Sequence, residues 1–99
     1  MDKNIKKNSD EILEQKFTIG NKLGLHARPA ALLVQVANTF QCEVTLQKGK
    51  QKVNGKSIMG VMMLAAGMGS VVTVRVVGSD ARKALAAISK LFNDKFQEE

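Results

Sequence analysis

The chain has 99 residues, of which 44% are hydrophobic and 24% charged, and a formal net charge of +6. These values predict one globular domain with a modest core, built from aliphatic side chains because the sequence has four Phe and no Trp or Tyr. With one cysteine and one histidine, the chain can form neither an internal disulfide nor a cysteine-based zinc site. It has no apolar run of membrane-spanning length, so we expect a cytoplasmic protein without membrane insertion.

The N-terminal residues 1–14 are polar and mixed in charge, so we expect a flexible extension there, with scope for a turn of helix over residues 10–14. The folded domain is expected to cover residues 15–99. Its first strand is predicted over residues 16–20, where two apolar residues alternate with polar neighbours.

A loop containing Gly24 leads to a predicted helix from Arg28 or Pro29 to about Thr39. Pro29 fits a helix start because proline is favoured in the first turn, where its missing N–H would have no helical partner in any case. Apolar residues then recur at helical spacing and form a stripe that we expect to be buried: Leu32, Leu33, Val36, Ala37 and Phe40.

Two short strands and a second helix follow. Alternation over residues 42–47 predicts a half-buried strand, Gly49 allows a hairpin loop, and residues 51–53 form the return strand. Ser57 is predicted to cap a helix over residues 58–65, because its side-chain oxygen can accept a hydrogen bond from a first-turn N–H.

The clearest strand is predicted over residues 70–78, where valines alternate with other residues. Ser79 or Asp80 is predicted to cap a last helix, whose apolar stripe continues to Phe96. The order is therefore strand, helix, strand, strand, helix, strand, helix. In each predicted strand apolar and polar side chains alternate, so only one side of the strand is apolar. With this order of elements, that pattern predicts a two-layer α+β sandwich, with a mainly antiparallel sheet and the helices on one face.

The only histidine and the only proline both lie in residues 24–30, GLHARPA. His26 is expected at or beside the N-cap of the helix that Pro29 starts, where first-turn N–H groups carry partial positive charge and can bind an anion. Arg28 adds a planar fork of donors that suits phosphate oxygens. Because the helix field disfavours a protonated imidazole, His26 is expected to be neutral near physiological pH and nucleophilic toward phosphorus.

Several other catalytic patterns are missing from the sequence. It has no second histidine to pair with a serine or cysteine nucleophile, no Walker motif, and no cluster of carboxylates for a metal–nucleotide site. We therefore expect no metal and no cofactor. The chain is interpreted as a phosphoryl carrier that larger enzymes handle, rather than as a stand-alone enzyme.

Two segments carry a resemblance to a known family: residues 24–30, GLHARPA, and residues 53–62, VNGKSIMGVM. At this spacing and in this order of strands and helices, they closely resemble HPr, the histidine-containing phosphocarrier proteins of the bacterial phosphoenolpyruvate-dependent sugar phosphotransferase system. The resemblance covers about residues 16–96. It implies an open-faced β-sandwich with a four-stranded antiparallel sheet and three helices on one face, in the order βαββαβα.

The resemblance also implies a mechanism. Enzyme I, phosphorylated from phosphoenolpyruvate, would pass its phosphoryl group to Nδ1 of His26, with Arg28 assisting the transfer. The carrier would then pass the group to IIA proteins or domains of sugar permeases. Ser57 matches the regulatory serine that HPr kinase/phosphorylase modifies with ATP in many bacteria. Phosphoserine at a helix N-cap is electrostatically favourable, so this modification and a capping role can coexist.

Further implications concern the partner surface. Ile58 and Met59 lie where the family has an apolar docking patch, and Lys56 is expected to meet acidic partner faces. The sequence departs from the family at Leu23, which stands where a small polar residue is frequent, and at Met63, which replaces a frequent serine. Since a small carrier must dock with several partners, we expect a monomer.

Two alternatives remain open on the sequence alone. The first is a mainly regulatory protein that acts through phosphorylated Ser57 in an incomplete phosphotransferase system; His26 argues against it, because family members specialised that way typically lack the histidine. The second is a small basic nucleic-acid-binding module. The lysines near the predicted hairpin favour it, but a solvated rim explains them as well and no aromatic residue lies among them to stack on bases, so no nucleic-acid partner is expected.

Overall fold

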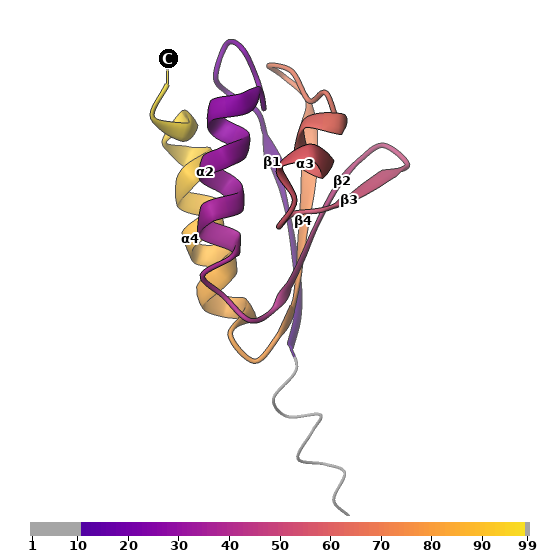
Figure 1. Ribbon diagram of the computed structural model, residues 1–99, viewed down its shortest axis with the longest axis vertical. Helices are drawn as coiled ribbons and strands as arrows, with labels where there is room; N and C mark the ends of the chain where they lie inside the picture. Colours follow the sequence, from indigo (N-terminus) through magenta and orange to yellow (C-terminus); the bar gives the residue numbers. More distant parts are fainter. Residues whose placement is uncertain (1–10, 99) are drawn as a thin grey trace, which may run out of the picture.

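The computed structural model describes residues 11–98, which form a four-stranded antiparallel sheet with helices against one face (Figure 1). The strand order in the sheet is β1-β4-β2-β3. Helices α2 and α4 lie side by side, and α3 packs against α2. The predicted two-layer α+β sandwich is confirmed. The elements are β1 (Glu11–Thr18), α2 (Ala27–Ala37), β2 (Glu43–Lys48), β3 (Gln51–Asn54), α3 (Ile58–Met63), β4 (Val71–Gly78), α4 (Ala81–Asn93) and the 3₁₀ turn η1 (Lys95–Gln97).

Strand β1 begins earlier than the sequence indicated. It pairs with β4 along its whole length, from Glu11 opposite Gly78 to Thr18 opposite Val71. The expected helical turn is therefore wrong for residues 11–14, which lie in the sheet although we assigned them to the N-terminal extension. These residues form a strand because their backbone groups pair with β4 along its length. The side chains of Ile12 and Glu14 are exposed, whereas Leu13 packs partly buried against the core. Residues 1–10 of the expected extension lie outside the described residues.

The core between the sheet and the helices is mainly aliphatic, as predicted, although Phe17, Phe92 and Phe96 also belong to it. Alternate side chains of β4 point into it, and Val72, Val74 and Val76 are all fully buried. At one end of the core, Phe92 of α4 stacks on Phe17 of β1 with ring centroids 4.5 Å apart. Burying this apolar face against the helices is what holds each amphipathic helix in place, because helices this short are marginal on their own. None of the helices within residues 11–98 is long and apolar enough to cross a membrane.

Helix α3 ends at Met63, two residues before the predicted end, because the backbone reverses at Ala65, whose φ is +49°. The β2–β3 hairpin closes this end of the helix. The ammonium of Lys48 donates to the carbonyl oxygens of Leu64 at 3.0 Å and Ala65 at 3.2 Å. A cation at this position donates hydrogen bonds to carbonyl oxygens that have no partner within the helix, and its charge is favourable at the negative end of the helix dipole. The hairpin thereby fixes where α3 lies.

Asp80 occupies the N-cap position of α4, as predicted, but its side chain does not cap the helix. Its carboxylate instead accepts hydrogen bonds from the backbone N–H groups of Gln41 at 2.8 Å and Cys42 at 2.9 Å. These bonds join the start of α4 to the loop that leads into β2. Donation by the Gln41 N–H is the main reason why the pKa of Asp80 lies below its ordinary value, and the Cys42 N–H acts in the same direction.

The C-terminal residues differ from the prediction that α4 continues to Phe96. Helix α4 ends at Asn93, and Lys95, Phe96 and Gln97 form a left-handed turn with φ between +53° and +63°. Phe96 is nevertheless buried, with its ring edge-on to Phe92 at a centroid distance of 4.9 Å. The apolar pattern thus identified a core residue correctly, but the turn directs the chain after it toward the start of α2.

The loop between β1 and α2 is held against the loop between α3 and β4. The N–H of Leu25 donates to the carbonyl of Ala66 at 2.9 Å. Gly24 stands at this crossing with a φ of +67°, and a Cβ atom there would lie 2.3 Å from the carbonyl oxygen of Ala66. Only glycine fits both the backbone conformation and the close approach. This crossing sets where the N-terminus of α2 lies.

We expect Gly24→Ala to lower the free energy of unfolding far more than Gly49→Ala. Both glycines have a similar φ, +67° and +61°, so both substitutions carry the left-handed cost of about 1–2 kcal/mol. A Cβ atom at Gly49 meets nothing within 4 Å, so only the Gly24 variant adds a steric clash. Urea denaturation measures both changes, and equal losses would contradict this account of the loop crossing.

The stability of the protein should depend on the ionisation of Asp80. Because the pKa of Asp80 is lowered in the folded state from its ordinary value of 3.8, its carboxylate stabilises the fold above that value. The stabilisation is lost as the pH falls through the lower, folded-state pKa. We therefore expect the difference in unfolding free energy between the natural chain and Asp80→Asn to be largest at neutral pH and to shrink in acid. A difference that does not change with pH would show that the carboxylate charge contributes nothing.

Candidate functional site

His26 is the N-cap residue of α2, as the sequence predicted. Its backbone is extended, with φ −79° and ψ −170°, and its carbonyl accepts the first helical hydrogen bond, from the N–H of Ala30 at 2.9 Å. Its side chain makes no capping bond, and the first turn of α2 contains no acidic residue. The N–H groups at this helix end are therefore available to an anion, and the helix dipole favours one there.

The side chain of His26 is 35% exposed, so a reactant can reach it from solvent. Arg28 lies in the first turn of α2 and is exposed. Pro29, the third helical residue, is buried and supplies no N–H. The histidine, the arginine and the helix end thus lie together at the surface, which is the arrangement that the sequence motif indicated.

One residue of this site was not found from the sequence. Both carboxylate oxygens of Glu98 lie beside Nε2 of His26, at 3.1 Å and 3.0 Å. The hydrogen bond to His26 is the main cause of a lowered pKa of Glu98, and the Asn21 amide and the charge of Arg28 act in the same direction. Nothing in the sequence signals this contact, because 72 residues separate the two side chains. The left-handed turn that brings Glu98 to His26 contains no glycine that would have indicated it.

Asn21 supports Glu98 from the other side. Its side chain is fully buried, and its Nδ2 donates to a carboxylate oxygen of Glu98 at 3.0 Å and to the carbonyl of Gly24 at 2.8 Å. The amide therefore joins the C-terminal segment to the loop that precedes His26. An asparagine in a predicted loop is too common a feature to have indicated this role.

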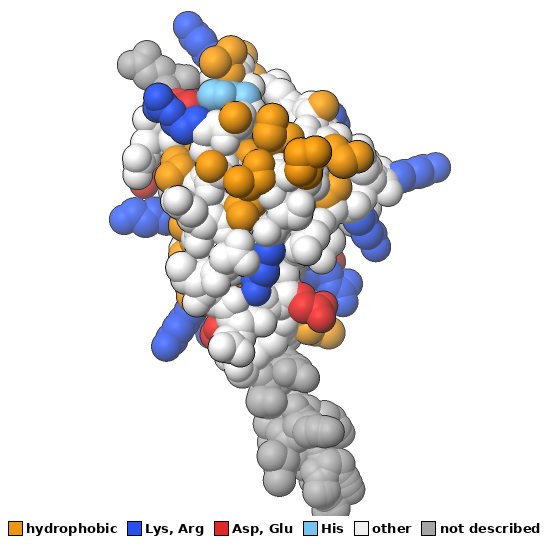
Figure 2. Space-filling model, in the orientation of Figure 1, with side chains coloured by type: hydrophobic (Ala, Val, Ile, Leu, Met, Phe, Trp, Pro, Cys, Tyr) orange, Lys and Arg blue, Asp and Glu red, His pale blue; other side chains and the backbone are white. Residues whose placement is uncertain are grey.

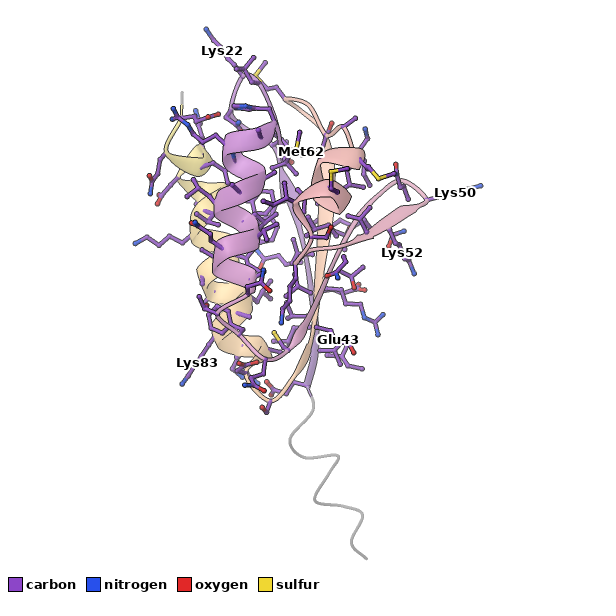
Figure 3. All side chains as sticks on the ribbon, viewed as in Figure 1. Lys22, Glu43, Lys50, Lys52, Met62 and Lys83 are labelled. Atoms are coloured by element: carbon purple, nitrogen blue, oxygen red, sulfur yellow. The ribbon has the colours of Figure 1, made fainter. Side chains whose placement is uncertain are left out.

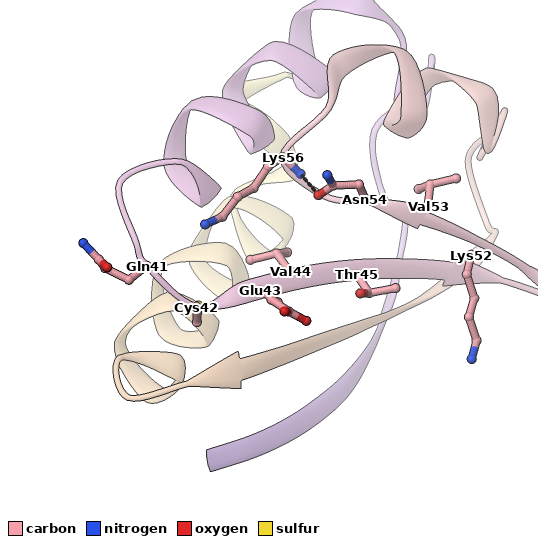
Figure 4. A pocket seen from close by; sticks show the side chains of 9 residues that line it. All are labelled: Gln41, Cys42, Glu43, Val44, Thr45, Lys52, Val53, Asn54 and Lys56. Carbon is pink, nitrogen blue, oxygen red and sulfur yellow. Dashed lines mark hydrogen bonds between the residues drawn. The ribbon is translucent and has the colours of Figure 1, made fainter. Parts of the chain in front are cut away.

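Among the pockets that residues 11–98 form, the one beside the imidazole is small and open. This shallow depression of about 250 Å³ is lined mostly by apolar residues that include Leu23 and Met62. A larger concavity of about 490 Å³ lies beside β2 and β3, lined by Glu43, Lys52 and Lys56 among others, and does not include His26 (Figure 4). The histidine site is thus an open surface rather than a substrate pocket.

Exposed apolar side chains gather near the histidine. In Figure 2, the pale-blue imidazole borders a group of orange apolar side chains. Helix α3 supplies an exposed set: Ile58, Met59, Met62 and Met63, with exposed fractions of 43%, 72%, 41% and 65%. Leu23, the departure from the family pattern, is also exposed at 72%. Its side chain extends the apolar surface in place of a polar group.

Ser57 caps α3 as predicted, since its Oγ accepts a hydrogen bond from the N–H of Gly60 at 3.0 Å. Lys56, expected at the partner surface, directs its ammonium to the carbonyl of Phe40, 2.6 Å away, just beyond the far end of α2. The structure therefore does not bring Lys56 into the histidine site. Its predicted contact with partners stays a prediction.

Comparison with known proteins gives a consistent result. Residues 13–94 match the family described as "PTS HPr component phosphorylation site". The chain is 50% identical over 88 residues to the phosphocarrier protein HPr of Xylella fastidiosa strain Temecula1, covering 89% of this chain and 99% of that protein. It is 52% identical over 79 residues to HPr of Treponema pallidum, covering 80% and 90%.

The fold supports the same assignment. The crystal structure of HPr from Thermoanaerobacter tengcongensis matches with a TM-score of 0.85 and 46% identity, covering 88% of this chain and 98% of that one. Sequence and structure agree over nearly the whole described region, and the histidine stands at the helix start that the motif indicated. The chain therefore belongs to the HPr family, the phosphocarrier proteins of the phosphotransferase system.

Proposed function

We propose that this phosphocarrier takes its phosphoryl group on Nδ1 of His26 from phosphorylated enzyme I and passes it to IIA proteins or domains of sugar permeases. The observation that supports this most directly is the exposed imidazole at the N-cap of α2, beside first-turn N–H groups that no acidic side chain of that turn occupies. A protein with this role works in the cytoplasm, and we expect a monomer that docks with each partner in turn.

The chemistry requires little from the carrier itself. The lone pair of Nδ1 forms a bond to phosphorus, while the bond from phosphorus to the donor atom of enzyme I breaks and leaves its electron pair on that atom. The three phosphoryl oxygens carry negative charge that the α2 N-terminus and the Arg28 guanidinium can stabilise. Because the site is open, the partner's surface excludes water and completes the positioning.

We assign partner docking to the exposed apolar face of α3, of which Ile58 and Met59 are part. Exposed methionines adapt to differently shaped partners, as a carrier with several of them requires. The ammonium of Lys56 donates a hydrogen bond to the carbonyl of Phe40, so we expect Lys56 to attract acidic partners through its charge rather than by direct contact.

Ser57 is proposed as a site of regulation by HPr kinase/phosphorylase. Its Oγ lies at the start of α3, next to the apolar docking face. A phosphate added there would sit at a helix N-terminus, where its charge is tolerated, and would place negative charge beside Ile58 and Met59. This negative charge would weaken the docking of partners to the apolar face, while α3 stays folded.

The remaining alternative of nucleic-acid binding gains no support. Lysine side chains project from separate parts of the molecule, with Lys22 and Lys83 toward opposite ends and Lys50 and Lys52 on the hairpin (Figure 3). A nucleic-acid interface needs basic groups gathered along one face. The positive charge of the chain is therefore interpreted as general surface charge.

Incubation with enzyme I and phosphoenolpyruvate should label the natural chain with one acid-labile phosphate. We expect no label on His26→Ala, since the nucleophile is gone, and slower labelling of Arg28→Ala, by about tenfold or more, because one source of charge stabilisation is lost. Rapid-quench labelling measures both. A natural chain that stays unlabelled contradicts the proposed function.

The same assay tests the docking face. Met59→Asp should raise the carrier concentration needed for half-maximal transfer, because a charge replaces an exposed apolar contact. Ile12→Asp is the matched control, since Ile12 is exposed to a similar extent, 59% against 72%, and belongs to the start of β1. That end of β1 lies at the opposite end of the molecule from the start of α2 (Figure 1). Equal effects of the two substitutions would contradict docking at α3.

Two results are expected for Ser57→Ala. Loss of the cap should lower the free energy of unfolding by about 1 kcal/mol, measured by urea denaturation. Incubation with HPr kinase and ATP should label the natural chain and leave Ser57→Ala unlabelled. Label that persists on the variant would show that the kinase modifies another residue.

A further inference from the structure

The carboxylate of Glu98 is held in a fixed position beside the imidazole of His26. Both carboxylate oxygens lie within 3.1 Å of Nε2, and the side chain of Glu98 is only 15% exposed. Asn21 donates to one of these oxygens at 3.0 Å. The carboxylate is thus held between a buried amide and the imidazole, and does not extend freely into solvent.

The segment that carries Glu98 is itself held at several points. Phe96 is 1% exposed and packs edge-on to Phe92. The side-chain carbons of Lys95 lie over Gly20, 3.4 Å from the position that a Cβ atom would occupy there. These two anchors and Gln97 are three consecutive residues with positive φ, which residues other than glycine adopt only where the surroundings impose it.

The orientation of Asn21 supports the same conclusion. Its Nδ2 serves two acceptors, Glu98 and the carbonyl of Gly24, while its buried Oδ1 has no partner among the described residues. Turning the amide over would set its oxygen against two acceptors. Leaving a buried oxygen without a partner costs free energy. The side chain keeps this orientation because its Nδ2 makes two hydrogen bonds, to Gly24 and to Glu98.

The chemistry of this contact selects one tautomer of the histidine. An ionised carboxylate only accepts hydrogen bonds, so Nε2 must carry the proton that it donates to Glu98. In the neutral ring Nδ1 then has the free lone pair. Within residues 11–98, Arg28 also acts on this contact, since its positive charge favours the ionised form of Glu98.

We propose that Glu98 is a positioning residue of the phosphoryl transfer, which keeps the proton of His26 on Nε2 and so presents Nδ1 to phosphorus. The inference rests on the proposed function and adds a residue to it. When Nδ1 bonds to phosphorus, the bond to the donor breaks with its electrons, and the ring becomes a cation that still holds the Nε2 proton. The carboxylate of Glu98 offsets that positive charge, as the aspartate does for the histidine of a serine protease triad.

The test compares Glu98→Ala with Glu98→Asp and with Asp94→Ala. Asp94 is an exposed acid just after α4, so its substitution removes the same charge from the same part of the chain without touching His26. The first measurement is the ¹⁵N chemical shift of both ring nitrogens at alkaline pH, which reports the tautomer without any phosphoryl transfer. The second is the rate of labelling by enzyme I and phosphoenolpyruvate, with the amide NMR spectrum as a check that each variant is folded.

We expect the natural chain and Asp94→Ala to show protonated Nε2 and equal labelling rates. In Glu98→Ala the tautomer with a proton on Nδ1 should appear, and labelling should slow about tenfold. Glu98→Asp, which keeps the carboxylate, should restore part of both properties. An unchanged tautomer in folded Glu98→Ala overturns the proposal, and so does an unchanged rate. A natural chain that enzyme I does not label overturns the proposed function instead, since the tautomer measurement is independent of it.

Discussion

The site depends on one backbone crossing, where the loop before α2 meets the loop before β4. The bond from the Leu25 N–H to the Ala66 carbonyl fixes this crossing, and Gly24 permits it because no side chain stands in the way. The crossing presents the N-terminus of α2, and with it His26, at the surface. A helix end placed there offers N–H donors and a favourable field that would otherwise need additional charged side chains.

An open site suits a protein that must both accept and release the same group. Tight enclosure would stabilise the phosphorylated form and slow its onward transfer, whereas a surface site lets each partner supply the missing donors. The apolar face of α3 lies next to the histidine, and the Lys48 ammonium fixes the end of that helix. The proposed docking face and the proposed phosphoryl site are thus positioned by different parts of one sheet-and-helix framework.

Local features of the sequence predicted the site as far as local physics determines it. Pro29 and the apolar stripe after it placed His26 at a helix start, and Ser57 was recognisable as a cap. The start of β1 was missed, because pairing with β4 holds it and only Leu13 of its first four residues contacts the core, too little to give an alternating pattern. Glu98 was missed for a similar reason, since a left-handed turn of three non-glycine residues, imposed by tertiary packing, brings it to His26.

The central claim is that Nδ1 of His26 is the atom that carries the phosphoryl group. The most direct measurement is the coupling between ³¹P and ¹⁵N in a ¹⁵N-labelled chain phosphorylated by enzyme I and phosphoenolpyruvate. We expect a single phosphorus resonance coupled to Nδ1, with Nε2 still bearing its proton. Coupling to Nε2, or phosphorus attached to any other residue, would contradict this account.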